Sequence, residues 1–92
     1  MVHAIVLLEV ERDKINTIAE QLVDMKGISE VYSVAGRYDL AVIVRVKNND
    51  ELAEAVTSQM LKIKGITKSE TLISFRVHSK YELERIFSVG MD

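Results

Sequence analysis

A strand–helix–strand pattern occurs twice along this 92-residue chain, and that order of elements constrains its fold more than any other feature. Segments rich in β-branched and apolar residues predict four strands, at 2–10, 28–35, 40–46 and 67–78. Between the paired strands, apolar residues recur at helical spacing over 15–23 and 52–63, and a short terminal helix is expected at about 80–88. The pattern predicts one α+β domain over residues 1–92, of β-α-β-β-α-β type, because a chain of this length has room for only one core.

The ends of the two predicted helices carry capping signals. Asp13 is placed to cap the first helix, and Asn48 followed by Glu51 resembles a capping box for the second. Gly27 and Gly65 stand where the C-terminal caps of the helices are expected.

The two halves of the chain also resemble each other weakly. Gly27-Ile28-Ser29 follows the first helix and Gly65-Ile66-Thr67 follows the second. Two strand–helix–strand units with right-handed crossovers give a four-stranded antiparallel sheet with both helices on one face. The expected strand order is 4-1-3-2.

The helix-free face of that sheet is unusually apolar. Side chains alternate across a strand, and both alternating sets of the first and third predicted strands contain aliphatic residues. Two helices can cover only one side. The aliphatic residues on the other side are Ile5, Leu7, Ala41 and Ile43. We predict that they form a dimer interface in which two sheets pack face to face; the alternative is a monomer with a few aliphatic residues at its surface.

Composition narrows the classes of function. The chain has 12 basic and 14 acidic residues and no basic cluster, which argues against direct nucleic-acid binding. It has no cysteine, and neither a metal-ligand spacing nor a catalytic motif is present, so we expect no metal and no cofactor. No apolar run is long enough to span a membrane and no signal peptide is recognisable, so a cytoplasmic protein is expected.

The two histidines are the only candidates for catalytic residues. His3 and His78 are separated by almost the whole chain, and isolated histidines on strands are more often structural than catalytic. The sequence therefore predicts a protein that is not an enzyme. The alternative is a dimeric α+β barrel enzyme such as a small monooxygenase, which would place these histidines in a pocket between sheet and helices.

The turn Gly36-Arg37-Tyr38-Asp39 combines several chemical groups within four residues. Glycine permits a tight turn and leaves its amide accessible. A carboxylate at Asp39 suits the ammonium group of a ligand, and Arg37 or a nearby amide suits a carboxylate. The pairing fits a zwitterionic amino acid; the alternative is an ordinary hairpin turn in which Asp39 caps local amides.

Two segments in register with this fold resemble those of a known family. Ser33-Val34-Ala35-Gly36-Arg37-Tyr38-Asp39-Leu40 resembles the Gly-x-Tyr-Asp segment of the leucine-responsive/asparagine-regulator (Lrp/AsnC) family. Gly65-Ile66-Thr67-Lys68-Ser69-Glu70-Thr71 resembles that family's Gly-Val-x-x-(Ser/Thr)-x-Thr segment, which enters the last strand. The matching part is the effector-binding RAM domain (regulation of amino acid metabolism), and the resemblance covers nearly the whole chain.

The resemblance implies a ferredoxin-like subunit that dimerises through its sheet and assembles into octameric or decameric rings. It also implies that amino acids bind between dimers at the Gly-x-x-Asp turn. The ligand-binding residues that it suggests are Gly36, Arg37, Tyr38 and Asp39, with Ser69 and Thr71 from the second segment.

Full members of the family carry an N-terminal helix-turn-helix domain, whereas this chain starts at its first strand. We therefore expect a stand-alone sensing domain that binds a free amino acid and does not itself bind DNA. It would influence the transcription of amino-acid metabolism indirectly, through its own assembly or by mixing with full-length Lrp/AsnC regulators. A structural assembly module that binds nothing is the alternative.

Overall fold

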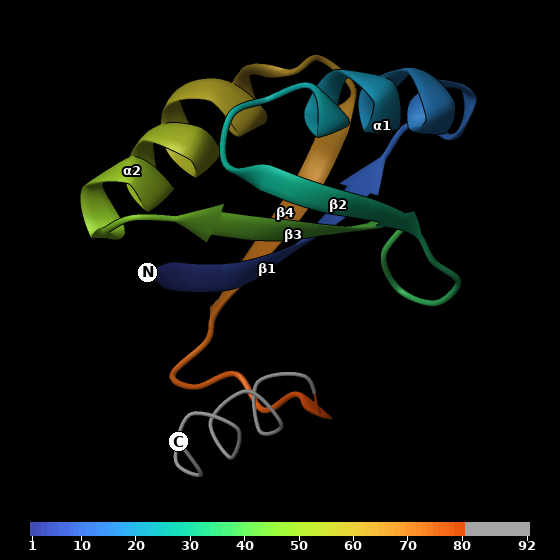
Figure 1. Cartoon of the computed structure of the whole chain (residues 1–92). Helices are drawn as coiled ribbons and strands as arrows, with labels where there is room; N and C mark the ends of the chain where they lie inside the picture. Colours follow the sequence, from blue (N-terminus) through green and yellow to red (C-terminus); the bar gives the residue numbers. More distant parts are fainter. Residues whose placement is uncertain (81–92) are drawn as a thin grey trace, which may run out of the picture.

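A computed structural model describes residues 1–80, and the predicted terminal helix falls outside the described residues. The elements run in the predicted order (Figure 1). They are β1 (Val2–Val10), η1 (Arg12–Lys14), α1 (Ile15–Val23), β2 (Ile28–Ser33), β3 (Leu40–Val46), α2 (Asn49–Ala53), η2 (Glu54–Gln59), η3 (Met60–Lys62) and β4 (Ile66–Ile73). The segment η2 is π-helical and continues α2, while η1 and η3 are 3-10 turns.

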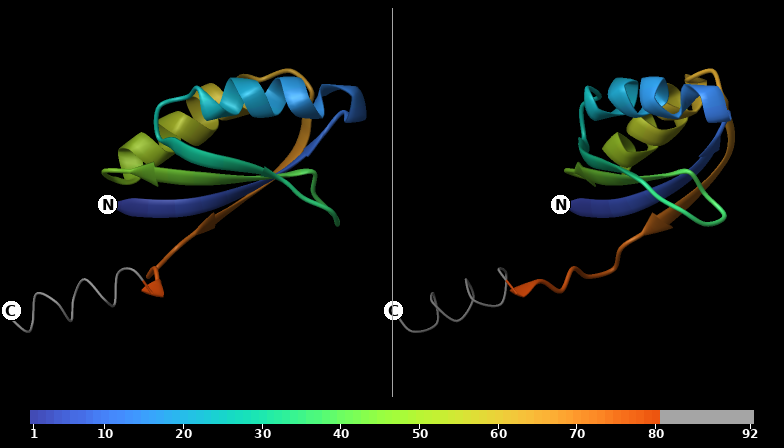
Figure 2. Two further views of the ribbon diagram at one scale, coloured as in Figure 1. Left: turned by 45° about the vertical axis from the view of Figure 1, so that its right-hand side comes forward. Right: turned by 90° about the vertical axis from the view of Figure 1, so that its right-hand side faces the viewer.

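The four strands form one antiparallel sheet in the order β2-β3-β1-β4. This is the predicted order 4-1-3-2 counted from the opposite edge, so the predicted topology is confirmed. Both helices lie on one side of the sheet, as the turned views show (Figure 2). None of the helices within residues 1–80 is long and apolar enough to cross a membrane.

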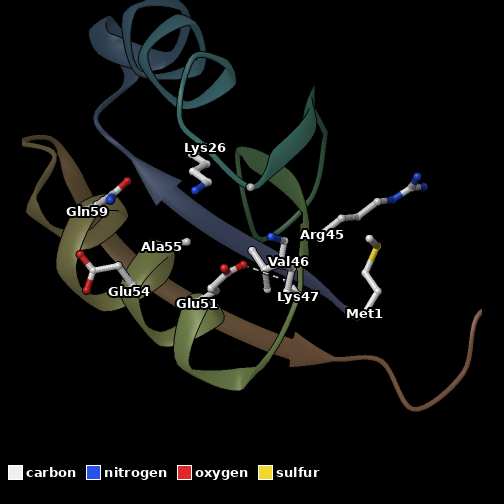
Figure 3. Close-up of a pocket in the computed structure, with 10 residues that line it drawn as sticks. Met1, Lys26, Arg45, Val46, Lys47, Glu51, Glu54, Ala55 and Gln59 are labelled. Carbon is white, nitrogen blue, oxygen red and sulfur yellow. Dashed lines mark hydrogen bonds between the residues drawn. The ribbon is translucent and has the colours of Figure 1, made fainter.

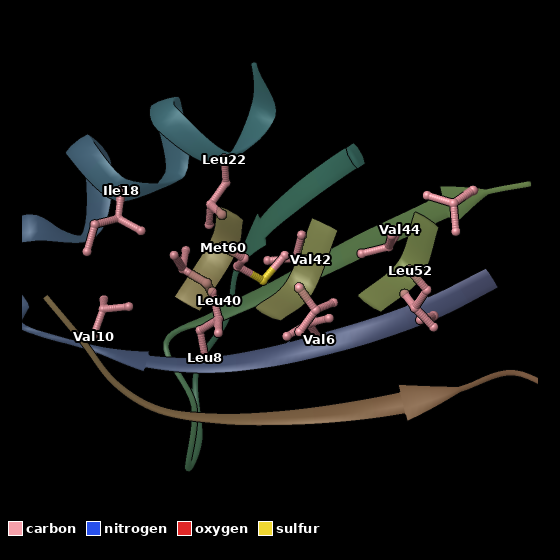
Figure 4. Packing of buried hydrophobic residues seen from close by; sticks show 13 residues of the cluster. Val6, Leu8, Val10, Ile18, Leu22, Leu40, Val42, Val44, Leu52 and Met60 are labelled. Carbon is pink, nitrogen blue, oxygen red and sulfur yellow. The ribbon is translucent and has the colours of Figure 1, made fainter. Parts of the chain in front are cut away.

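The core lies between the helices and the two central strands (Figure 4). Alternate residues of β1 and β3 point toward the helices and are buried. Ile18 and Leu22 of α1 and Met60 of η3 pack against them from the helix layer. The largest fully buried side chains are Leu8, Ile18, Leu22, Leu40, Met60, Val6, Val42 and Val44. The predicted apolar stripes of both helices therefore supply the core, except at Val23, which is exposed.

The helix layer covers the sheet unevenly. The main contacts of α1 are with β2 and β3, and those of α2 are with β3. Neither helix packs substantially on β4, so the helix side of that edge strand stays open and Ile73 is 57% exposed. One face of the sheet is thus only partly covered, and the other has no cover within residues 1–80.

Of the two predicted N-terminal caps, Asn48 is confirmed and Asp13 is wrong. Asn48 Oδ1 accepts a hydrogen bond from the Glu51 amide at 2.9 Å, so the predicted N-cap is confirmed. Glu51 Oε2 accepts from the Lys47 amide at 3.0 Å, one residue before the amide that a full capping box uses. The predicted Asp13 cap was wrong, because the chain first forms the turn η1, in which the Lys14 amide donates to the Glu11 carbonyl at 2.9 Å. No side-chain cap precedes η1 or α1.

Two strands end earlier than their apolar patterns predicted. β4 stops at Ile73 rather than residue 78, because its partner β1 runs out: the Ser74 amide bonds to the His3 carbonyl, and β1 begins one residue earlier. β2 stops at Ser33 rather than residue 35, where the chain leaves β3 to form the hairpin loop.

Gly27 and Gly65 occupy equivalent positions in the two halves. Both have positive φ, 91° and 105°, and both lie beyond the helix ends, at the turns into β2 and β4, so they are turn residues rather than direct helix caps. A Cβ at Gly27 would meet Val46 Cγ1 at 2.8 Å, and one at Gly65 would meet Ile18 Cδ1 at 2.9 Å. The weak internal repeat therefore reflects a shared requirement of the fold.

We predict that Gly65→Ala destabilises the protein by about 1–3 kcal/mol, because alanine must adopt a left-handed backbone and crowd Ile18. Urea denaturation followed by circular dichroism measures the loss. Gly36→Ala is the matched control, since Gly36 has φ 129° but no atom within 4 Å of the position that a Cβ would occupy. An equal loss in both variants would contradict the role given to the Ile18 contact.

Candidate ligand-binding loop and assembly face

Asp39 ties the hairpin loop between β2 and β3 to the end of β1. The last residue pair of β1 and β3 is Leu8 opposite Leu40. The next amide of β1 on the β3 side, that of Val10, therefore has no backbone acceptor on β3. Asp39 Oδ2 accepts from the Val10 amide at 2.9 Å, and the Asp39 amide donates to the Leu8 carbonyl at 2.8 Å. The side chain thus extends the β-ladder by one step.

This geometry bears on both interpretations of the turn, as a ligand-binding site and as an ordinary hairpin turn in which Asp39 caps local amides. Asp39 does satisfy a backbone amide, but that amide belongs to β1 and lies 29 residues away in sequence. Within residues 1–80, the second carboxylate oxygen of Asp39 has no hydrogen-bond partner. Asp39 therefore holds the loop in place with one oxygen, and the other has no partner within the described residues.

Tyr38 folds back over the helix-free side of the sheet. Its hydroxyl donates to Glu70 Oε2 at 2.9 Å, and Lys68 Nζ lies 5.8 Å from its ring centroid, within cation–π range. The hydrogen bond to the Glu70 carboxylate raises the pKa of the Tyr38 phenol above its ordinary value. Tyr38 thus joins the hairpin loop to β4 across the end of β1.

The tip of the loop projects into solvent. Gly36 and Arg37 are exposed, and no side chain within residues 1–80 lies near the position of a Gly36 Cβ. The views of Figure 2 show this loop on the side of the sheet opposite the helices. The loop therefore carries an amide, a guanidinium, a phenol and a carboxylate near one corner of the helix-free side.

Ser69 and Thr71 lie on the other side of β4. They pair with Leu8 and Val6, whose side chains face the helices, whereas Lys68 and Glu70 pair with the outward-facing Glu9 and Leu7. Both hydroxyl residues are exposed because no helix covers β4. Within one subunit, the structure brings the 36–39 loop to Lys68 and Glu70 and not to Ser69 and Thr71.

Sequence reasoning missed the contribution of Lys68 and Glu70 to this corner. The alternation of side chains in β4 separates them from Ser69 and Thr71, but their contact with Tyr38 depends on the path of the hairpin loop. No local pattern in the sequence carries that path.

The four residues predicted for a dimer interface form the centre of the helix-free side. Ile5 lies opposite Ile43, and Leu7 lies opposite Ala41. Ile5 is 40% exposed in the single chain, and the other three are half-buried. The register adds two residues that the prediction left out: Leu72 opposite Ile5 and Tyr32 opposite Ala41, which are 46% and 48% exposed. We call these six residues the open face.

The histidines do not form a pocket between sheet and helices. His3 lies opposite Arg45 on the helix-free side and is half-buried, while His78 is exposed beyond the end of β4. Among residues 1–80, no group of three or more histidine, aspartate and glutamate side chains is arranged to hold a metal ion.

A β-α-β-β-α-β subunit with an open sheet face and a polar hairpin loop at its corner has the form of a regulatory ligand-binding domain. The sequence profile of the family described as Lrp/AsnC ligand binding domain matches residues 3–83. The chain belongs to this family.

The curated relatives are transcriptional regulators. The HTH-type transcriptional regulator FL11 of Pyrococcus furiosus is 34% identical over 77 residues, which are 84% of this chain and 50% of that protein. A second, uncharacterized HTH-type transcriptional regulator of the same organism is 31% identical over 84 residues, which are 91% of this chain and 56% of that protein. The chain therefore spans about half the length of these relatives.

Solved structures share the fold. TTHA0845 from Thermus thermophilus superposes with a TM-score of 0.82 at 35% identity, over 87% of this chain and 100% of that chain. AsnC of E. coli gives a TM-score of 0.78 at 19% identity, over 85% of this chain and 53% of that chain. The regulator NMB0573 of Neisseria meningitidis, solved as a complex with L-Met, gives 0.75 at 11% identity, over 86% and 54%. At these lower identities the likeness concerns the fold alone.

We predict that Asp39→Ala destabilises the chain by about 1–3 kcal/mol, because the buried Val10 amide loses its acceptor. Asp39→Asn keeps an acceptor oxygen at the same place and should retain most of the stability. Urea denaturation gives the free energies, and hydrogen exchange of the Val10 amide reports the local effect. Asp24→Ala, at an exposed position after α1, is the control; an Asp39→Ala protein as stable as this control would contradict the structural role.

Proposed function

We propose that this chain is an amino-acid-responsive regulatory module that assembles through its open face. It acts without catalysis in the cytoplasm and influences the transcription of amino-acid metabolism indirectly. Its assembly, or its mixing with full-length Lrp/AsnC regulators, carries the signal. The family to which the chain belongs supports a ligand-binding role, and the regulators among its relatives support the link to transcription.

The observation that carries this proposal is the contact between the loop and the open face. Tyr38 donates to Glu70, and Glu70 lies opposite Leu7, one of the residues at the centre of that face. A ligand at the loop would therefore touch the border of the surface that a second subunit covers. Binding and assembly would share the same residues.

The chemistry of the loop suits a free amino acid. The second oxygen of Asp39 is available for an ammonium group, and Arg37 or the Gly36 amide for a carboxylate. The complex of NMB0573 with L-Met supports the same ligand class in a protein of this fold. Ser69 and Thr71 face the other side of β4, so in this proposal they reach a ligand from a neighbouring subunit.

Ligand binding shifts an assembly only when the ligand binds the assembled state more tightly. A site completed by residues of two subunits provides that difference. The proposed assembly is a dimer formed by the open faces, with octameric or decameric rings built from such dimers. The amino acid would tighten or rearrange the contacts between dimers.

We predict that Ile5→Lys weakens the dimer by at least about tenfold, because a charge at the centre of the apolar contact must be desolvated. Analytical ultracentrifugation over a range of concentrations measures the dissociation constant. Val23→Lys is the matched control, since Val23 is 50% exposed on α1, away from the open face. A wild-type chain that stays monomeric at high concentration would exclude the proposed dimer.

Isothermal titration calorimetry with each proteinogenic amino acid tests the ligand. At least one should bind the wild type, and Asp39→Asn should weaken that binding by about tenfold or more while preserving the Val10 contact. Light scattering in the presence of that amino acid should show a change in assembly. The absence of heat with every amino acid would reject the ligand and leave a purely structural assembly module.

A further inference from the structure

A cavity lies within the single chain, at the opposite end of the sheet from the hairpin loop. It has a volume of about 400 Å³ and opens between the turn that precedes β2, the end of β3 and the helical segment formed by α2 and η2. Val46 at its base pairs with Val2 at the start of β1, whereas the loop is attached at Leu8 and Val10 near the other end of that strand. The cavity also lies on the helix side, so it is separate from the site proposed above.

Small residues keep this cavity open. Gly27 has no side chain, and its backbone passes so close to Val46 that a Cβ would lie 2.8 Å from Val46 Cγ1. Ala55 contributes only a methyl group from the helical side. Ala55 and Gln59 belong to the π-helical segment η2. Single turns of π-helix are rare and occur often at functional sites.

The base of the cavity is apolar. Val46 and Ala55 are 7% and 4% exposed, and both line the cavity wall. The volume falls within the range of small-molecule sites, which combine a mostly apolar lining with a few polar groups that orient the ligand. A short aliphatic group fits the chemistry of this base.

Side chains of opposite charge line the cavity above that base. Lys26 and Glu51 both line the cavity, Lys26 from the turn that precedes β2 and Glu51 from α2 (Figure 3). They form no ion pair, and within residues 1–80 Lys26 has no acidic partner. One oxygen of Glu51 accepts from the Lys47 amide, which fixes the carboxylate and leaves its other oxygen free.

We propose that this cavity is a second amino-acid site, contained within one subunit and suited to a small aliphatic side chain. Lys26 binds the ligand carboxylate, Glu51 binds its ammonium group, and the side chain rests on Val46 and Ala55. Charge-assisted hydrogen bonds at both ends favour a zwitterion over a simple acid or amine. The inference rests on the proposed function for its ligand class alone, because it uses none of the residues of the hairpin loop.

The test is an NMR titration of ²H,¹⁵N-labelled full-length chain with L-alanine, L-valine and L-leucine. Asp39→Asn protein is titrated in parallel, so that binding at the loop is weakened while the fold is kept. At least one amino acid should shift the amides of Lys26, Gly27, Val46 and Ala55 in both proteins. Isocaproate, which lacks the ammonium group of leucine, and isoamylamine, which lacks its carboxylate, should each require at least about tenfold higher concentrations than leucine.

Variants separate a specific site from a passive cavity. Lys26→Gln and Glu51→Gln each remove one charge, and the glutamine at 51 keeps an acceptor for the Lys47 amide. Each should raise the half-saturating concentration by about tenfold or more. Lys64→Gln, at another exposed lysine that does not line this cavity, should leave it unchanged.

The outcomes distinguish this inference from the proposed function. Shifts confined to residues 36–39 would overturn the second site and leave the loop site standing. Shifts at the cavity that survive in both Lys26→Gln and Glu51→Gln would overturn the assigned roles. The absence of shifts anywhere would overturn both proposals, whereas shifts at the cavity alone would support this site and count against the loop.

Discussion

The limited cover that two short helices give to a four-stranded sheet governs the rest of this structure. α1 and α2 bury the inward side of β1 and β3, but they leave the inward side of β4 open and do not reach the other face at all. Ile5, Leu72 and Tyr32 consequently remain between 40% and 48% exposed in the single chain. Burial of apolar surface stabilises a fold, so the proposed dimer would gain stability by covering these side chains.

The hairpin loop contacts both the end of β1 and the border of the open face. One oxygen of Asp39 completes the hydrogen bonding of β1, and Tyr38 reaches across to Glu70 at the border of the open face. In the proposed function these residues both support the sheet and meet the ligand, which would link ligand binding to the geometry of the surrounding strands. The proposed regulation would require no chemical step.

The sequence predicted the fold well because the relevant signals are local and repeated. Apolar alternation located the four strands, helical spacing located most of the core residues of both helices, and Asn48 was correctly identified as an N-cap. Some errors occurred where a distant partner decides the outcome. β4 ends where β1 runs out, although apolar residues continue to alternate along its own sequence as far as Val77. The error at Asp13 is local, because a 3-10 turn closed by the Lys14 amide and the Glu11 carbonyl takes the place of the cap.

By itself, the sequence determined the order of elements, the strand order and the face on which each aliphatic residue lies, because periods of two and 3.6 residues fix side-chain direction along a strand or helix. Only the tertiary structure decided which polar groups meet. It brought Tyr38 to Glu70, left Ser69 and Thr71 on the opposite side of β4, and placed Lys26 and Glu51 in the lining of one cavity. These contacts depend on strand register, sheet twist and the course of the turns. Such features involve residues far apart in the chain and produce no periodic pattern in its sequence.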